Sequence, residues 1–422
     1  MRRAGPSPAS NSAAAGGSAA ARPQAREDPA SAPADADAIV VGAGPVGMAL
    51  AAALARERLS VALVDRGELA AFDAPAGADD WDARVYAISP GSAEFLRGIG
   101  VWQRLPQERL TPIETMDVRG DDGGRIRFSA YELGERALAW IVEHRELCRS
   151  LVESVRTAGP VEVLAPCDPS AVSWRVDAAV LTLADGRALT ARVIVGADGV
   201  RSWLRREAGI EREPRPYQQS AIVANFACER AHRGRAFQWF LAGSGVLAWL
   251  PLPGRRISMV WSAPDALAAE LASIDPAALA SRVGEAGEHA LGALTPITPA
   301  ASFALSFLRL PSIIAHRLAL VGDAAHGVHP LAGQGLNLGL GDAAALASVL
   351  GAARVVGDVG APLVLERYAH KRAGPVLAMQ LATDGLIRLF APPALKRLRN
   401  VGMRAVGAFS PVKRLLAQPA LR

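Results

Sequence analysis

Three glycines near the start of the chain, Gly42, Gly44 and Gly47, have the spacing of a loop that holds phosphates. The first glycine allows a tight turn, the second allows a pyrophosphate to approach the backbone, and the third allows a helix and a strand to lie close together. A helix that starts in this loop presents free N–H groups and the positive end of its dipole to the phosphates. The spacing therefore predicts a dinucleotide site.

The segments around this loop have the order that such a site requires. Residues 38–41 read as a buried strand, residues 45–58 as a helix rich in alanine and leucine, and residues 60–64 as a second strand that ends at Asp65. Asp65 is placed to accept hydrogen bonds from a ribose diol. The loop by itself does not distinguish NAD from FAD.

Two later segments add further Gly-Asp turns. Residues 191–202 form a buried strand that runs into Asp198-Gly199, and residues 317–326 form another that runs into Gly322-Asp323. After the second turn comes a glycine-rich stretch, residues 330–337, which leads into a helix. An NAD site does not need these extra elements, whereas FAD has a ribitol chain and an isoalloxazine ring that must also be held.

In these motifs the sequence resembles the class A flavoprotein aromatic hydroxylases, of which para-hydroxybenzoate hydroxylase is the type. That family carries the glycine loop, an Asp-Gly motif and a Gly-Asp motif in this order. More narrowly, the sequence is similar to the ubiquinone-biosynthesis hydroxylases through residues 82–89, 142–147 and 322–342. The resemblance runs from about residue 38 to the C-terminus.

The resemblance implies a set of FAD-binding residues. Asp323 would bind the ribitol hydroxyls, and the helix entered at Gly335 would aim backbone N–H groups at the flavin edge that becomes negative on reduction. Arg84 and Arg145 match positions near the phosphates and ribose, although ordinary surface arginines remain an alternative. Asp198-Gly199 would serve both FAD and the nicotinamide, unless it is a plain turn. The cofactor-binding residues predicted are Gly42, Gly44, Pro45, Val46, Gly47, Asp65, Arg66, Arg84, Arg145, Asp198, Gly199, Asp323, Gly335, Leu336 and Asn337.

The resemblance also implies the reaction. NAD(P)H would donate a hydride to FAD and leave, and the reduced flavin would react with O2 to give a C4a-hydroperoxide that hydroxylates an aromatic ring. The chemistry then belongs to the flavin, and we assign no catalytic side chain. His329 and Pro330 are expected near the isoalloxazine. A metal at His326 and His329 is not expected, because Asp323 is better used on the ribitol.

The expected fold is α/β, with a Rossmann-like FAD-binding domain, an inserted and mainly antiparallel substrate domain, and a C-terminal helical tail. Residues 1–37 lack aromatic and long aliphatic side chains, which predicts a disordered tail. The FAD-binding domain is assigned to residues 38–108, 140–212 and 303–355, the substrate domain to residues 109–139 and 213–302, and the C-terminal helices to residues 356–422.

The strands expected in the substrate domain contain few charges and several aromatic residues. Phe237, Trp239, Trp249 and Trp261 are candidates for a pocket that takes an apolar aromatic substrate, although each can equally be part of the sheet core. The low charge argues against a small carboxylated substrate and favours a polyprenylated phenol. The predicted function is therefore hydroxylation of a phenolic ring in ubiquinone biosynthesis.

Composition excludes several classes of protein. The formal net charge is +5, but the arginines are dispersed, and nucleic acid is not an expected partner. Three separated cysteines argue against a disulfide framework or a structural zinc site, and they suit a reducing cytoplasm. No apolar run is expected to reach the length needed to span a bilayer. Membrane contact is therefore expected to be peripheral, at the inner face.

Residues 393–422 alternate basic and apolar residues. Such a tail suits an anionic membrane surface or a protein partner in quinone biosynthesis, and a helix packed on the FAD-binding domain is the alternative. Three other functions remain open. They are an isoprenoid-type flavin reductase or dehydrogenase, a catabolic phenol hydroxylase that acts on a soluble acid, and a non-enzymatic subunit.

Overall fold

The structure is a computed structural model that describes residues 34–72, 77, 79–210, 212–329, 331–355, 357–390, 392–408 and 410–421. Most of the predicted disordered tail, residues 1–33, and Pro330 lie outside the described residues. The first strand begins at Ala36, two residues earlier than expected. All the elements below belong to the one compact unit formed by Ala34–Arg422.

A mainly parallel sheet forms the first half of the fold, with the strand order β18-β19-β11-β1-β2-β8. The strands β19, β11, β1, β2 and β8 run parallel, while β9 and β10 extend β11 as an antiparallel flap. Short apolar runs rich in valine, leucine and isoleucine form these strands, because both faces of the sheet are covered. The strands are β1 (Ala36–Val41), β2 (Val61–Val64), β8 (Val161–Leu164), β9 (Pro169–Trp174), β10 (Ala179–Leu183), β11 (Ala188–Gly196), β18 (Ile314–Ala315) and β19 (Leu318–Leu320).

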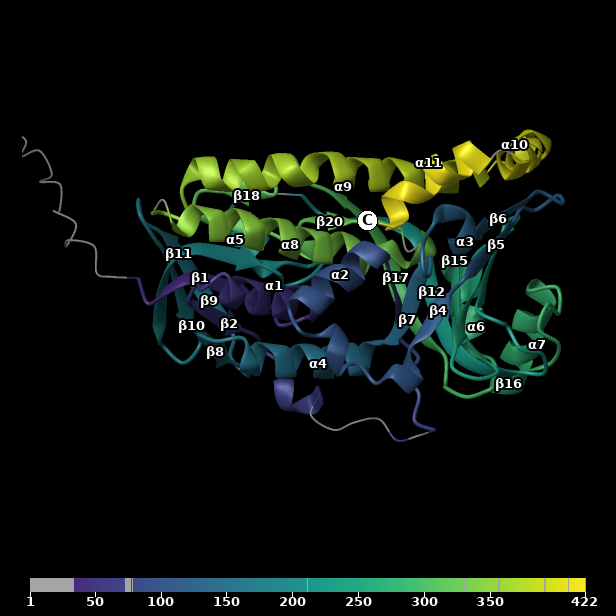
Figure 1. Ribbon diagram of the computed structural model, residues 1–422, viewed down its shortest axis with the longest axis horizontal. Coiled ribbons are helices and arrows are strands. Elements are labelled where there is room, and N and C mark those ends of the chain that lie inside the picture. The colour runs from purple at the N-terminus through teal and green to yellow at the C-terminus, as the bar shows by residue number, and fades with distance from the viewer. Residues whose placement is uncertain are drawn as a thin grey trace, which may run out of the picture. The chain divides into compact units, whose positions relative to one another are not determined.

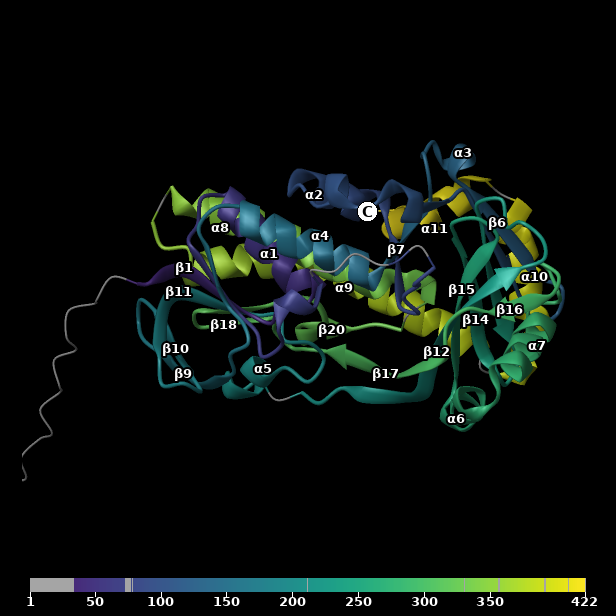
Figure 2. The same cartoon turned by 90° about the horizontal axis from the view of Figure 1, so that it is seen from below.

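Helices cover one face of this parallel sheet. Valines and leucines of β1, β2 and β11 share a core with α1 (Pro45–Arg56), α4 (His144–Thr157) and α8 (Gln334–Arg354). The opposite face packs against β9, β10 and the short α5 (Trp203–Glu207). The long α9 (Pro362–Phe390) lies alongside α8 in both views (Figures 1 and 2). This arrangement is the Rossmann-like domain that the glycine loop predicts.

A second, mainly antiparallel sheet has the strand order β20-β17-β12-β15-β14-β13-β5-β6, and β16 also pairs with β12. The run β13-β14-β15 is the meander expected from the glycine and proline turns. The pair β13 and β5 is parallel. The strands are β5 (Thr115–Arg119), β6 (Arg125–Ser129), β12 (Arg215–Cys228), β13 (Arg235–Leu241), β14 (Gly245–Leu252), β15 (Arg256–Pro264), β16 (Leu294–Pro296), β17 (Ala301–Arg309) and β20 (His326–Gly327).

The two faces of the antiparallel sheet have different neighbours. Its outer face packs against α6 (Asp265–Ser273) and α7 (Pro276–Ala286), and α7 lies on the side away from α1 and α4 (Figures 1 and 2). Its inner face is turned toward the parallel-sheet half. Asn225 on this face donates to the Asp82 carbonyl (2.8 Å), and Phe240 packs against Leu331.

Smaller elements connect these two halves. A small sheet has the order β3-β7-β4 and consists of β3 (Val85–Ile88), β4 (Thr111–Ile113) and β7 (Ala139–Glu143). Helices α2 (Pro90–Gly98) and α3 (Ala130–Leu133) follow β3 and β6. Short 3-10 turns complete the chain at Leu69–Phe72, Trp102–Arg104, Gln107–Arg109, Gly322–Ala324, Leu331–Gly333 and Pro393–Leu395.

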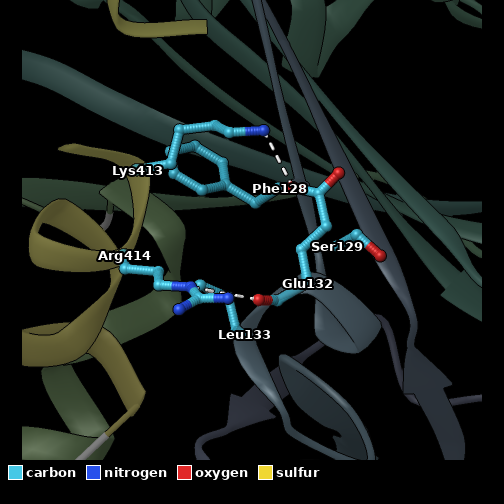
Figure 3. A pocket seen from close by; sticks show the side chains of 6 residues that line it. All are labelled: Phe128, Ser129, Glu132, Leu133, Lys413 and Arg414. Atoms are coloured by element: carbon cyan, nitrogen blue, oxygen red, sulfur yellow. Dashed lines mark hydrogen bonds and ion pairs between the residues drawn. The ribbon is translucent and has the colours of Figure 1, made fainter. Parts of the chain in front are cut away.

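The C-terminal tail is helical, as expected, but it docks on the antiparallel sheet. Arg399 of α10 (Lys396–Ala408) forms an ion pair with Asp121 in the turn between β5 and β6, and Asn400 accepts from Gly124 N (2.9 Å). In α11 (Ser410–Leu421), Lys413 reaches Glu132 of α3 at 2.8 Å, and Arg414 donates to the Glu132 carbonyl (Figure 3). Several basic residues of the tail therefore form ion pairs and hydrogen bonds with other parts of the same chain.

One described helix, α8, is long and apolar enough to cross a membrane by length and composition. A helix of this length and apolarity was not predicted from the sequence, because its many glycines and alanines are less hydrophobic than the residues of a typical membrane span. However, 61% of its apolar window is buried. Leu340, Ala343, Leu346 and Leu350 pack into the core that α8 shares with α1, so the apolar character of this helix is explained by the fold.

Candidate active site

The glycine loop has the geometry that its sequence predicts. Gly42 has φ +108°, and a side chain there would overlap the Ala197 carbonyl. A Cβ atom at Gly47 would overlap the Gly42 carbonyl oxygen, so only glycine lets α1 approach β1 this closely. At Gly44, in contrast, a Cβ atom would meet nothing within 4 Å. The loop is therefore closed around Gly42 and Gly47 and open at Gly44, where a ligand can reach the backbone.

Asp65 lies beside this loop at the end of β2. Its carboxylate accepts hydrogen bonds from the backbone N–H groups of Ala43 (2.6 Å) and Gly67 (2.7 Å). An ionised carboxylate has about four acceptor positions, so these two bonds leave room for a ribose hydroxyl. Arg66 follows and is exposed. Asp65 thus shapes the loop in addition to the role predicted for it.

The Asp198-Gly199 turn adjoins the glycine loop. Ala197, just before it, donates its N–H to the Val41 carbonyl at 2.8 Å, which brings the end of β11 against the end of β1. One oxygen of Asp198 accepts from Leu204 N (3.0 Å), and the other is buried without a hydrogen-bond partner in the described part of the chain. Gly199 has φ +80° and open space around its Cα. An unpaired buried acceptor is unfavourable, and a donor from a ligand would satisfy it.

The Gly322-Asp323 turn lies against α1 and α8. A Cβ atom at Gly339 of α8 would come within 2.7 Å of Val46 and 3.1 Å of Gly322, so close contact requires glycine here. The side chain of Asp323 is exposed, whereas Ala324 and Ala325 after it are fully buried. The surrounding protein raises the pKa of the Asp323 carboxyl by desolvation, and His326 and Arg84 oppose this shift. Asp323 therefore lines a recess that is open to solvent.

Helix α8 begins at the same place with an uncapped N-terminus. Gly333 precedes it with φ +65° and has no side chain to cap the helix. A Cβ atom at Gly335 would meet nothing within 4 Å, and Leu336 is half-buried. The side chain of Asn337 is already engaged, because it donates to the Ala87 carbonyl (2.8 Å) and accepts from Ser89 N (2.9 Å). The backbone of this first turn is thus available to a ligand, whereas the side chain of Asn337 is not.

Arg84 lies near the Asp323 carboxyl, whereas Arg145 is in a different setting. The guanidinium of Arg84 is exposed and lies 5.5 Å from the ring of Phe303 and 5.4 Å from the ring of Tyr86. Arg145 pairs with Asp80 at 2.7 Å. Its Nε atom is buried and lacks a hydrogen-bond partner among the described residues. Arg84 is thus the more available of the two cations.

His329 is fully buried next to the stretch that leads into α8. Its Nε2 lies 3.0 Å from Oε1 of Gln219 on β12, and its ring stands edge-on to Tyr217 at 5.1 Å. Burial lowers the pKa of His329 to about 4, so the imidazole is neutral at physiological pH. No group of His, Cys, Asp and Glu that could hold a metal occurs among the described residues, and Pro330 is not among them.

The aromatic residues proposed for a substrate wall occupy the outer face of the antiparallel sheet. Phe237, Trp239, Trp249 and Trp261 have exposures of 3% or less and share a core with α6 and α7. This position corrects the expectation from the sequence, since these side chains point away from the glycine loop and from Asp323. The sequence did contain a signal for this orientation. Alternate residues along a strand face opposite sides of the sheet, so the residues next to these four along each strand face inward.

The inner face is built from those alternate positions. It is mainly apolar and partly open, with Val246, Ala248, Leu250 and Val260 half-buried and Phe303 41% exposed. Its polar members include Gln219, Asn225 and Gln238, which are amides. Asn225 contacts Asp82, and Gln219 contacts His329, so this face reaches the Asp323 recess.

Comparison with known proteins identifies this architecture. Residues 35–381 match the family model described as the FAD binding domain. The chain belongs to this family. It is 39% identical to the ubiquinone hydroxylase UbiL of Rhodospirillum rubrum over 96% of this chain and 94% of that protein. It is also 33% identical to 3-demethoxyubiquinol 3-hydroxylase of Escherichia coli over 90% and 97% of the two chains.

The solved structures agree with this assignment. PqsL of Pseudomonas aeruginosa in complex with 2-aminobenzoylacetate superposes with a TM-score of 0.73 at 25% identity, covering 87% of this chain and 99% of that one. The resemblance to flavin hydroxylases, the fold class and the FAD cofactor are thereby confirmed. The chain is an FAD-dependent monooxygenase, and NAD(P)H and O2 are the co-substrates typical of its family. The division into domains by residue number stays a prediction.

Proposed function

We propose that this enzyme hydroxylates a prenylated phenolic ring in ubiquinone biosynthesis, with NAD(P)H as the reductant. The observation that carries the proposal is the 39% identity to a ubiquinone hydroxylase over nearly the full length of both chains. The similarity to the Escherichia coli 3-demethoxyubiquinol 3-hydroxylase also extends over 90% of this chain and 97% of that protein. Similarity of this extent includes the substrate-facing sheet as well as the FAD-binding motifs.

The residues of the recess fit FAD. Two backbone segments, at Gly44 and Gly335, are open to a ligand and lie at uncapped helix N-termini, which favour phosphate and a negatively charged flavin edge. The unpaired oxygen of Asp198 and the exposed carboxylate of Asp323 are acceptors for hydroxyl groups. We assign FAD binding to Gly42, Gly44, Pro45, Val46, Gly47, Asp65, Arg66, Arg84, Arg145, Asp198, Gly199, Asp323, Gly335, Leu336 and Asn337.

Bound FAD would accept a hydride from NAD(P)H and activate oxygen for transfer to the ring. The chain supplies binding, orientation and electrostatics for this chemistry. The first turn of α8 stabilises negative charge at its N-terminus by about 0.3–2 kcal/mol. Asn337 fixes that turn against β3 and Ser89.

The inner face supports an apolar substrate. The inward positions of β12 to β15 are Gln219, Ala221, Val223, Asn225, Ala236, Gln238, Phe240, Val246, Ala248, Leu250, Ser258, Val260 and Ser262. Arg256 continues this alternation in β15, and its guanidinium lies 5.0 Å from the centre of the Trp81 ring at the end of the same face. The middle of this face is uncharged, which suits an apolar substrate. Because Arg256 and Arg84 are cations at the same face, the similarity to ubiquinone hydroxylases, rather than the charge of the lining, favours the prenylated phenol over a soluble aromatic acid.

The exposed apolar side chains support peripheral contact with a membrane. Leu377, Leu381, Leu386 and Leu389 on α9 and Leu398 and Val401 on α10 have exposures between 37% and 67%. The exposed Arg388, Arg397 and Arg404 lie among them. A surface that is both apolar and basic fits an anionic bilayer, where a prenylated substrate resides. These side chains support a proposal that the enzyme is peripheral at the inner face of the membrane and contacts it through α9 and α10.

The test of the proposed reaction is quinone analysis of a strain from which the gene is deleted. The strain should accumulate a prenylated ring that lacks one hydroxyl, and the wild-type gene should restore ubiquinone whereas an Asp323→Ala variant should not. Purified enzyme supplied with that intermediate, NAD(P)H and 18O2 should place one 18O atom in the product. Reduction of the substrate without 18O would instead identify an isoprenoid-type reductase.

A further inference from the structure

A buried charged cluster lies directly behind the Gly322-Asp323 turn. Asp342 of α8 is fully buried, and it contacts Arg372 of α9 and His326 of β20 at 2.6 Å each. Its oxygen Oδ2 also accepts the backbone N–H of Gly322 at 2.9 Å. Three elements, β20, α8 and α9, therefore meet at one carboxylate.

The contacts of Asp342 surround Asp323 in the chain. Gly322 precedes Asp323 and is held through its N–H, and His326 follows it and is held through its ring. Arg372 anchors the other side of the cluster, because it also donates to the Leu338 carbonyl at 2.9 Å. Asp342 itself is too deeply buried to meet a ligand. Any influence that it has on a ligand must pass through the turn.

The ionisation of the cluster agrees with this geometry. Burial alone would raise the pKa of Asp342, but His326, Arg372 and the Gly322 N–H together lower it below the usual range. The carboxylate is thus charged at neutral pH and accepts hydrogen bonds at both oxygens. A charged acceptor forms stronger hydrogen bonds than a neutral one, which makes it suited to fixing a backbone turn.

We propose that Asp342 is a positioning residue for FAD, and that with Arg372 and His326 it holds the Gly322-Asp323 turn so that the Asp323 carboxylate meets the ribitol hydroxyls. This inference rests on the FAD-binding role proposed above for Asp323. It assigns a function to a residue that does not itself reach the cofactor. It also explains why α8 carries an acidic residue inside an otherwise apolar and buried segment.

The test measures the FAD dissociation constant of the full chain, from the quenching of flavin fluorescence on titration into apoprotein. Asp342→Asn should weaken FAD binding by about tenfold to a hundredfold, the range that corresponds to the loss of a charge-assisted hydrogen bond. Arg372→Lys, which keeps the charge, is the milder second variant and should weaken binding by a smaller factor. Thermal unfolding of each apoprotein shows whether it is folded.

Asp117→Asn is the matched control. Asp117 is also fully buried and pairs with two arginines, Arg119 and Arg125, but it lies in β5 of the antiparallel sheet. This control should lower the unfolding temperature and leave the FAD dissociation constant unchanged. If Asp342→Asn behaves in the same way, with lower stability and unchanged FAD affinity, the inference is overturned.

The double variant Asp323→Ala/Asp342→Asn separates positioning from general stability. If Asp342 acts through Asp323, the second substitution should add little to the loss of FAD affinity caused by the first. If the double variant loses FAD affinity by the full product of the two single-variant factors, the inference is overturned. An Asp323→Ala variant with unchanged FAD affinity would instead refute the proposed role of Asp323, and the inference with it.

Discussion

Gly44 and Gly47 belong to one motif, yet the structure gives them different tasks. A side chain at Gly47 would overlap the carbonyl oxygen of Gly42, whereas a side chain at Gly44 would point into open space. Gly44 has φ −67°, which any residue can adopt. Gly47 is therefore required by the fold itself, and Gly44 is required only when a ligand is bound.

Gly44→Ala should leave the unfolding temperature of the apoprotein unchanged and weaken FAD binding by about tenfold or more, since the methyl group occupies space at the phosphates. Gly47→Ala should destabilise the apoprotein by about 1–3 kcal/mol, because α1 must move away from β1. Thermal unfolding and flavin titration of both variants check this. Equal destabilisation by the two substitutions would contradict it.

His329 illustrates how burial decides the charge of a residue. The ring is fully buried, and its pKa falls from the ordinary value of 6.5 to about 4. Between these two pH values the unfolded chain binds a proton that the folded chain does not. The stability contributed by neutral His329 is therefore complete above about pH 6.5, and it is lost as the pH falls toward 4.

We expect the free energy of unfolding to fall by on the order of 3 kcal/mol between pH 6.5 and 4 through His329 alone. His144 and His232, whose pKa values burial also lowers, add losses of the same sign. Urea unfolding of the wild type and of His329→Gln at several pH values isolates the share of His329. The variant should show a flatter dependence on pH, and parallel curves would count against the assignment.

At the scale of elements, α10 is docked on one hairpin, whereas α11 contacts α3 through Lys413 and Arg414. Asn400 is fully buried, and it accepts from Gly124 N (2.9 Å) and donates to Asp121 (2.8 Å) in the turn between β5 and β6. A Cβ atom at Gly124 would overlap the amide of Asn400. Close approach of α10 to this turn thus depends on the absence of a side chain at residue 124.

Gly124→Ala should release α10 from the hairpin, at a cost of about 1–3 kcal/mol in docking free energy. Hydrogen exchange and limited proteolysis should both increase across residues 396–408, while FAD affinity stays the same. Gly402→Ala is the control on the same helix, because a Cβ atom there meets nothing within 4 Å. Unchanged exchange in Gly124→Ala would show that the tail is held in another way.

At the scale of the whole molecule, exposed apolar and basic side chains occur together on α9 and α10. It carries Leu381 and Leu398 at 62% and 67% exposure and Val401 at 54%, with arginines among them. The tail uses Arg399 and Lys413 to dock on the antiparallel sheet and leaves Arg397 and Arg404 exposed. Basic residues on such a surface strengthen attraction to anionic lipids.

Leu381→Asp/Leu398→Asp/Val401→Asp should abolish sedimentation with vesicles that contain anionic lipid, and wild-type binding should weaken as salt is raised. Val176→Asp, at another exposed apolar residue (83%), is the matched control and should still bind. Activity on a short-chain, water-soluble substrate analogue should survive in both variants. Retained vesicle binding by the triple variant would indicate that another surface meets the membrane.

The FAD-binding motifs were readable from the sequence because their signals are local. Gly42 needs a backbone conformation that side chains disfavour, and Gly47 needs space within a few residues of Gly42, so residue type and spacing reveal both. The parallel strands and their order along the chain follow from short apolar runs separated by a helix. The general architecture of both halves was predicted for the same reason.

Long-range contacts decided which side chains face the site and which are already engaged. Alternation along β13 and β14 separates the two faces of the sheet, but only the packing of α6 and α7 shows that Phe237, Trp239 and Trp249 face outward. The side chain of Asn337 is held by β3, about 250 residues earlier in the chain.

The residues proposed to bind the cofactor could thus be recognised in the sequence itself, from the backbone geometry that they require and from their spacing. Their neighbours were determined by the tertiary structure, because burial and charge pairing join segments that are remote along the chain. Asn337 and Ala87, which are 250 residues apart, are one case. Asp342 is a second case at shorter separation. In the sequence it is one acid in an apolar run, and in the fold it joins Arg372 and His326 behind Asp323.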